Sequence, residues 1–172
     1  TQLSNGRFQV RLTFSKCFPI LRDSKEIALQ RLYSSELKFA KNIMLEINYH
    51  NFIKEDINLD HMLLLGSFTE QKIESKPHHF LPHHAVSKTD GVTEKICVVF
   101  DGSVKPSVGK SINACLSTGS KVQNDISDAI IRSRTHEVAF TADICNMYHQ
   151  ILIHPEDRRY EKTLWWDDPV LY

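Results

Sequence analysis

Residues 138–153 read VAFTADICNMYHQILI, and this stretch decides the fold that the sequence predicts. The first six residues are a mainly apolar run that ends in Asp143, a pattern typical of a buried strand followed by a carboxylate. From Tyr148 to Ile153 the side chains alternate, which predicts a second strand. A carboxylate beside a buried strand is costly unless it is paired, hydrogen-bonded or bound to a metal. Asp143 is therefore the leading candidate for chemistry, although an aspartate that caps a turn explains the spacing equally well.

Other strands are predicted on both sides of this stretch. Residues 95–101, KICVVFD, form a second apolar run that ends in an acid, and residues 85–88 precede it. Residues 7–14 alternate apolar and polar side chains, which predicts a half-buried strand whose apolar face carries Phe8, Val10, Leu12 and Phe14. Residues 162–166 suggest one more strand.

Helices are predicted in three places. The Asp23 to Glu26 spacing is that of a capping box and opens a helix, and a second helix begins near Asn42. A third is predicted over residues 124–134, which carry isoleucines at helical spacing. The side chains expected to face a core from the first two helices are Ile27, Leu29, Leu32, Leu37, Ile43, Ile47 and Phe52. Helices and strands in this order predict a mixed α+β domain.

Composition sets broad limits on function. The 172 residues contain 21 Lys and Arg and 21 Asp and Glu, so a uniform charge field is excluded as a means of recognition. The 41% hydrophobic content is that of a globular chain with a core. No apolar run reaches the roughly 18 residues of a membrane span, and the first residues lack the pattern of a secretory signal. We therefore expect no membrane partner and free thiols at the four cysteines, Cys17, Cys97, Cys115 and Cys145.

The residues from Asp143 to Tyr148, with residues 150–151 and 154–159, resemble the first catalytic motif of reverse transcriptases, specifically those of Pao/BEL-type LTR retrotransposons. Further segments resemble this family in the expected order. Residues 6–10 are similar to the start of the polymerase after the protease region. Segments 81–86, 98–103 and 111–113 resemble the fingers, and residues 134–136 precede the palm strand.

This resemblance implies a fold. It is that of the fingers and part of the palm of an RNA-directed DNA polymerase, with N-terminal helices followed by antiparallel strands. Residues 1–75 would be an N-terminal strand and helical segment leading into the polymerase. Residues 76–172 would be the fingers and a palm truncated before the paired-aspartate motif, and the missing initiator methionine fits a piece of a longer chain.

The resemblance also implies a mechanism. Two Mg²⁺ ions would activate the primer 3′-hydroxyl and stabilise charge on the nucleotide phosphates. Asp143 matches the metal-binding aspartate, with the backbone carbonyl of Ile144 as the neighbouring ligand, and Tyr148 matches the steric gate that excludes a 2′-hydroxyl. Lys88 corresponds to the fingers lysine that contacts the incoming triphosphate. The implied partners are an RNA or DNA template-primer, dNTPs and the rest of the Pol polyprotein, within a cytoplasmic virus-like particle.

Two departures from the family pattern predict that this chain alone is inactive. Cys97 stands where the family usually has arginine, and a thiol cannot replace a guanidinium that binds triphosphate. The second catalytic motif, a hairpin with paired aspartates, is absent. Asp167 and Asp168 are interpreted as part of a turn, since Pro169 follows them and cannot donate to a central strand ladder. The alternative function is a non-catalytic remnant of a retroelement polyprotein that binds nucleic acid or protein.

Four arginines and a histidine cluster are weaker candidates for function. Arg132, Arg134, Arg158 and Arg159 are candidates for tracking nucleic-acid phosphates, although solvated faces explain each one singly. A histidine cluster suggests zinc, but its spacing fits no closed structural site, so packing is the preferred interpretation and a metal protein the weakest hypothesis. The cluster consists of His78, His79, His83 and His84.

Overall fold

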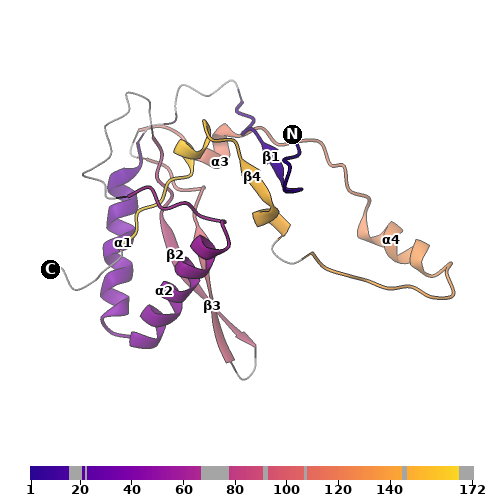
Figure 1. Cartoon of the computed structure of the whole chain (residues 1–172), viewed down its shortest axis with the longest axis horizontal. Coiled ribbons are helices and arrows are strands. Elements are labelled where there is room, and N and C mark those ends of the chain that lie inside the picture. The colour runs from indigo at the N-terminus through magenta and orange to yellow at the C-terminus, as the bar shows by residue number, and fades with distance from the viewer. Residues whose placement is uncertain are drawn as a thin grey trace.

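A computed structural model of the chain describes residues 1–15, 21, 23–66, 78–90, 93–106, 108–144 and 147–166, with only the backbone described at 88–90 and 93–95. The architecture is a mixed arrangement of helices and two small sheets (Figure 1). The elements are β1 (Phe8–Val10), α1 (Lys25–Phe39), α2 (Ile43–Asn58), β2 (His83–Asp90), β3 (Thr93–Phe100), α3 (Ile112–Cys115), α4 (Ile126–Ser133), the 3₁₀ helix η2 (Met147–Gln150), β4 (Ile151–Ile153) and the 3₁₀ helix η3 (Arg158–Tyr160). The structure thus confirms the predicted α+β class as a mixture of helices and strands.

Helices α1 and α2 begin close to the predicted positions. Asn42 caps α2, since its side-chain oxygen accepts a hydrogen bond from the Leu45 N–H at 3.1 Å. The N-cap of α1 is Ser24 rather than Asp23, which instead accepts from the Lys25 N–H. The Ser24 hydroxyl bonds to the backbone of Phe80, so the start of α1 is fixed to the segment before β2.

The core-facing side of these helices agrees with the prediction in part, since Leu32 is buried and Phe52 is partly buried, but other predicted residues are exposed. Ile43 is 64% exposed and Ile47 is 46% exposed, and Leu37 of α1 also lies at the surface. The buried stripe of α2 contains Tyr49 and Ile53, four residues apart on one helix face. The prediction assigned apolar residues to the core by type, whereas α2 buries an aromatic side chain that finds a polar partner for its hydroxyl.

Strands β2 and β3 form an antiparallel hairpin against the two helices (Figure 1), and β3 confirms the strand predicted from residue 95 as far as Phe100. Helix α1 contacts β2 and helix α2 contacts β3. The first apolar cluster lies between these layers and is formed by Phe39, Tyr49, Ile53 and Val98, with Trp165 stacked on Tyr49 at 5.3 Å between ring centroids.

The second sheet joins the two ends of the described chain. β1 pairs with β4 in parallel, with Phe8 opposite Ile151 and Val10 opposite Ile153. The apolar face expected for residues 7–14 is met in part: Phe8 and Val10 are exposed, because neither helix covers this small sheet, whereas Leu12 and Phe14 are partly buried. Beside it lies a second apolar cluster of Leu21, Ile112, Cys115 and Tyr160. Both clusters contain residues from before and after position 75.

Residues 117–150 form an arm that projects from this body, and every described residue in it is exposed (Figure 1). Helix α4 lies within the predicted range 124–134. The predicted buried strand at 138–143 is wrong, since these residues have no strand structure and Val138 and Phe140 are 81% and 91% exposed. An apolar run forms a buried strand only when a neighbouring strand pairs with it and another layer covers it, and the body offers this segment neither.

The remaining predictions are partly met. Of the strand predicted from Tyr148 to Ile153, only the last three residues are extended, as β4. Residues 162–166 contribute a single bridge between Phe80 and Lys162 rather than a strand. Cys97 is a free thiol as expected, Cys115 is buried in the second apolar cluster, and Cys17 and Cys145 lie outside the described residues. Within the described chain, no helix has the length and apolar character needed to cross a bilayer.

Candidate functional site

Asp143 and Tyr148, the two leading candidates from the sequence, both lie on the exposed arm. The Asp143 carboxylate accepts a hydrogen bond from the Ile144 N–H at 2.9 Å, and Tyr148 is 79% exposed at the start of η2. This bond joins neighbouring residues, one position short of the two-residue step of an Asx turn, so it does not decide between turn capping and metal binding. Asp143 does not belong to a group of three or more potential metal ligands among the described residues.

The two positions predicted to contact a nucleotide both lie on the hairpin. In the strand register Lys88 is opposite Lys95, and Val86 is opposite Cys97. Because side chains alternate along a strand, positions 88 and 97 share one face of the ladder, opposite to the face of Val98, which packs on the helices. The Cys97 thiol is partly buried, and its sulfur lies 3.9 Å from the carbonyl oxygen of Val98.

The four candidate arginines are divided between two places. Arg132 and Arg134 lie at the end of α4 on the arm, and Arg132 borders a shallow pocket with Asn124 and His136. Arg158 donates to the carbonyl of Ile153 at 3.0 Å, and Arg159 donates to the Tyr160 hydroxyl at 2.7 Å. The second pair thus also stabilises the turn after β4. The structure does not gather the four guanidinium groups into one surface, since α4 projects away from β4 (Figure 1).

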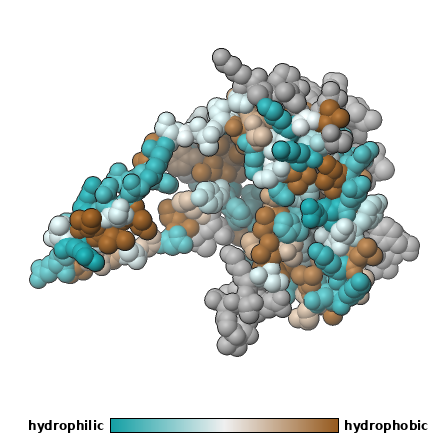
Figure 2. Space-filling view, turned by 180° about the vertical axis from the view of Figure 1, so that it is seen from behind, coloured by the Kyte–Doolittle hydropathy of each residue, from teal (hydrophilic) through white to brown (hydrophobic). Residues whose placement is uncertain are grey.

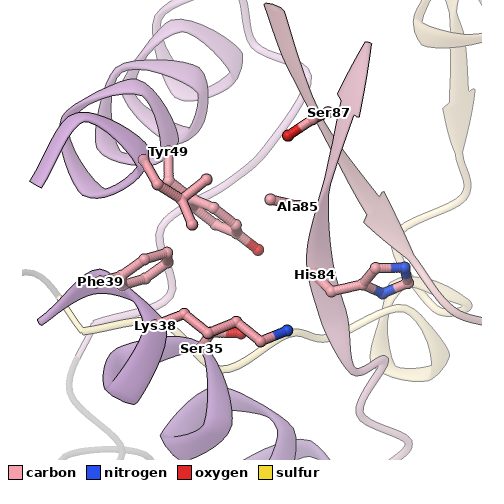
Figure 3. Close-up of a pocket in the computed structure, with 8 residues that line it drawn as sticks. Ser35, Lys38, Phe39, Tyr49, His84, Ala85 and Ser87 are labelled. Atoms are coloured by element: carbon pink, nitrogen blue, oxygen red, sulfur yellow. The ribbon is translucent and has the colours of Figure 1, made fainter. Parts of the chain in front are cut away.

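A small pocket of about 180 Å³ lies between α1, α2 and β2. Figure 3 shows the Tyr49 hydroxyl and the Lys38 ammonium group pointing toward β2, whereas His84 lies on the far side of that strand. Ligand pockets usually measure about 300–1,000 Å³. The space is therefore smaller than an ordinary small-molecule site, and we interpret it as imperfect packing between the layers.

Two members of the predicted histidine cluster are buried in separate environments. His79 lies 3.1 Å from the Ser24 hydroxyl through its Nδ1 atom. The Nε2 atom of His83 donates to the Leu164 carbonyl at 2.8 Å, which leaves its Nδ1 atom to accept from the Tyr49 hydroxyl. Burial lowers the pKa of His83, and the bond to Leu164 offsets only part of that shift. Both imidazoles therefore serve packing, the preferred interpretation from the sequence.

A different group of side chains meets where α2 ends. The Nδ1 atom of His61 lies 3.3 Å from an Asp56 carboxylate oxygen and 3.0 Å from the Nδ1 atom of His149. The distance from that His149 atom to the same Asp56 oxygen is 4.0 Å. These three residues are the single grouping of potential metal ligands among the described residues.

The backbone structure at the end of α2 explains why two of these three residues, Asp56 and His61, lie together. After α2, Asp60 adopts a positive φ of 55°, and the N–H of His61 bonds to the carbonyl of Asp56 at 2.9 Å while that of Asp60 bonds to Ile57. This is the Schellman ending of a helix, and it turns His61 back over Asp56. The sequence analysis missed the group: the short Asp56 to His61 spacing was available as a signal, but nothing in the sequence relates His149 to them.

Arg7 brings His149 to the end of α2. Its Nη2 atom donates to the carbonyl of His149 at 2.6 Å, and its Nη1 atom lies 3.5 Å from the carbonyl of Asp60. The guanidinium thus bridges two backbone segments without using an imidazole nitrogen.

Comparison of the chain with protein-family models, with curated proteins and with solved structures found no match in any of the three. Functional inference for this chain thus depends on its own residues, on their geometry and on the resemblance of its motifs to a family.

Proposed function

We propose that the chain is the fingers and part of the palm of a Pao-like retrotransposon reverse transcriptase. The parent activity is RNA-templated transfer of nucleotides to a DNA primer. The observation that carries the proposal is the β2–β3 hairpin, an antiparallel pair that follows two helices in the order implied for the fingers.

The hairpin supports a nucleotide-binding role through its register. Positions 88 and 97 are the ones that match the triphosphate-contacting lysine and arginine of the family, and they share one face of the ladder. Two cations on one face suit a triphosphate, because its charge is spread over several oxygens. With Cys97 in place of arginine, this chain supplies one of the two, so its affinity for dNTPs is reduced.

The arm supports the proposal through its uncovered apolar side chains. Val138 and Phe140 precede Asp143 on a segment with no described neighbour, and Figure 2 shows apolar residues on the surface of this projection. An exposed apolar group of this kind marks a surface that another polypeptide covers. In the complete polymerase, we propose, residues 138–143 pair as a palm strand and carry Asp143 beside the paired aspartates.

Catalysis by this chain alone is not expected. A two-metal site needs several carboxylates around ions about 3.5–4 Å apart, and Asp143 is the single carboxylate that matches the first motif. Mg²⁺ therefore belongs to the completed site, with Asp143 and the Ile144 carbonyl as its contribution from this chain.

A chimera tests the proposal. Residues 1–166 would replace the corresponding part of an active Pao-type reverse transcriptase that keeps its own paired aspartates. We expect primer extension on an RNA template that is lost in Asp143→Asn, and increased use of ribonucleotides in Tyr148→Ala, because the smaller side chain leaves room for a 2′-hydroxyl. Cys97→Arg should lower the KM for dNTPs.

The controls distinguish a chimera that does not fold from one that folds and contradicts the proposed function. Asp128→Asn, on the exposed face of α4, is a matched substitution that should leave extension unchanged. A chimera that folds by circular dichroism and binds template-primer but extends nothing would overturn the proposal. So would extension that is indifferent to Asp143→Asn.

One observation favours the alternative of a non-catalytic binding remnant, namely that Asp143 already bonds to its own backbone neighbour. Salt-dependent binding of RNA by the 172-residue chain, without activity in the chimera, would support this alternative. Absence of RNA binding at low salt would exclude the hypothesis that the remnant binds nucleic acid.

A further inference from the structure

We propose that Asp56, His61 and His149 form a binding site for one divalent transition-metal ion of the zinc type. The site lies where α2 ends and where the arm returns to the body just before β4. It is separate from Asp143 and does not depend on the proposed polymerase function.

The spacing of the three ligand atoms matches the size of a zinc ion's coordination shell. The separations are 3.0 Å, 3.3 Å and 4.0 Å. The point equidistant from the three atoms lies about 2.0 Å from each, and zinc keeps about 2.0–2.2 Å to imidazole nitrogen and carboxylate oxygen. Shortening the longest edge toward the roughly 3.3 Å of a tetrahedron would lift the ion from this plane and open a fourth position.

Hydrogen bonding satisfies the group only by sharing one proton between two acceptors. The Nδ1 atom of His61 faces both Asp56 and His149, but a ring nitrogen carries either one proton or one lone pair. If it donates to Asp56, it has no lone pair for His149, and the His149 nitrogen can at most share the same proton in a bifurcated bond. If it accepts from His149, its lone pair faces the Asp56 carboxylate. A metal cation accepts lone pairs from all three atoms at once and removes this conflict.

The surroundings suit a bound ion with one open side. The side chains of Asp56 and His61 are 11% and 8% exposed, whereas that of His149 is 44% exposed. The two buried ligands sit on the rigid end of α2, and the exposed one leaves a path for the ion and for a water or a fourth ligand. The nearby cation Arg7 bonds to backbone carbonyls, so it leaves the lone pairs of the ligand atoms available.

The ligand chemistry selects the class of metal. Two imidazole nitrogens and one carboxylate oxygen favour zinc and other borderline metals, whereas Mg²⁺ and Ca²⁺ prefer oxygen ligands in larger number. The ion would join residues 61 and 149, which are 88 positions apart, and so would hold the arm's return point against the helix.

The experiment uses the purified 172-residue chain, freed of metal with a chelator. Competition with a chromophoric zinc chelator should show one equivalent bound, and Co²⁺ should give a tetrahedral absorption spectrum without a thiolate charge-transfer band. Zn²⁺ should also raise the thermal unfolding midpoint. His61→Ala and His149→Ala should each weaken binding by more than the about 10–100-fold that loss of an outer-shell partner costs.

A matched control is His136→Ala, which removes an exposed histidine from the arm outside the group. It should bind zinc with the affinity of the parent chain. Because nearly half of the His149 side chain is exposed, its variant should fold normally, and an unchanged circular dichroism spectrum without metal would verify this. Equal zinc affinity in His149→Ala and His136→Ala, a thiolate band, or no binding by the parent chain would each overturn the proposal.

Discussion

Arg11 donates two hydrogen bonds to the carboxylate of Asp157, from Nε at 2.6 Å and from Nη2 at 3.0 Å. The Leu12 N–H donates to the same carboxylate at 3.0 Å. The Asp157 side chain is 5% exposed, whereas that of Arg11 is 57% exposed. One buried acid therefore fixes the chain just after β1 to the turn that precedes η3.

The first prediction concerns this pair. Asp157→Asn should lower the free energy of unfolding by about 1.5–3 kcal/mol, the range for hydrogen bonds to charged groups. The matched control is Glu156→Gln, whose partner is also Arg11 but whose side chain is 66% exposed, and it should cost less than about 1 kcal/mol. Urea denaturation measures both values, and equal losses would contradict the assigned role of burial.

The second prediction is a loss of stability on acidification in two steps. Burial lowers the pKa of His83, so the unfolded chain takes up this proton more readily and stability falls as pH drops below about 6.5. For Asp157, burial raises the pKa, but the hydrogen bonds from Arg11 and Leu12 and the nearby positive charges lower it by more. Its contribution is thus present above about pH 4 and is lost below that, as pH falls toward its folded-state pKa.

Urea midpoints measured from neutral pH downward check both steps. His83→Gln should flatten the upper step and leave the lower one, and Asp157→Asn should do the reverse. His136→Gln, at an exposed site, should retain both. If the upper step were unchanged in His83→Gln, its assignment would be wrong.

The third prediction concerns the positive φ of Asp60. Left-handed backbone costs an ordinary residue about 1–2 kcal/mol, and glycine avoids this cost. Asp60→Gly should therefore keep or raise the thermal midpoint, whereas Asp60→Val should lower it, because a β-branched side chain fits this conformation worst. Since Asp60 is exposed and contributes no ligand atom, Asp60→Gly should leave zinc affinity unchanged. A midpoint lowered equally by both variants would contradict this backbone account.

The fourth prediction separates an exposed arm from a buried palm strand. In the 172-residue chain Phe140→Ser should change stability by less than about 0.5 kcal/mol, as expected for a surface position. Val98→Ser, in the buried cluster between the hairpin and the helices, should cost about 2 kcal/mol or more. A large loss from Phe140→Ser would show that residues 138–143 are covered in solution.

Local signals in the sequence predicted the helices and the strand at 95–101 well, whereas the hairpin that this strand forms with residues 83–90 was not predicted. Asn42 begins α2 because its side chain is a good N-cap, and the apolar run at 95–101 found both a pairing strand and a covering layer. The run at 138–143 looks similar but lacks both in this structure. A sequence pattern shows which segments are apolar enough to be buried. Whether a segment is buried depends on neighbouring elements, and the sequence of the segment does not identify these.

The candidate sites likewise differ in how well the sequence could predict them. Asp143 and Tyr148 were found by motif, and their geometry in this chain does not assemble a metal site. Asp56, His61 and His149 do meet, but through a helix ending and through the bridge of Arg7 between two backbone carbonyls. A contact made by distant segments through backbone atoms leaves no side-chain pattern to read.

The parallel pairing of β1 with β4 has a consequence for how the chain reaches its fold. Residues 8–10 meet strand β4 only at 151–153, so during synthesis they have only the local bridge between Gln2 and Phe8 until nearly the whole described chain has left the ribosome. Closing the long loop between these two strands is slow, because the chain loses conformational entropy before the strand contacts form and stabilise it. The helices and the hairpin form from near neighbours, and the N-terminal strand joins last.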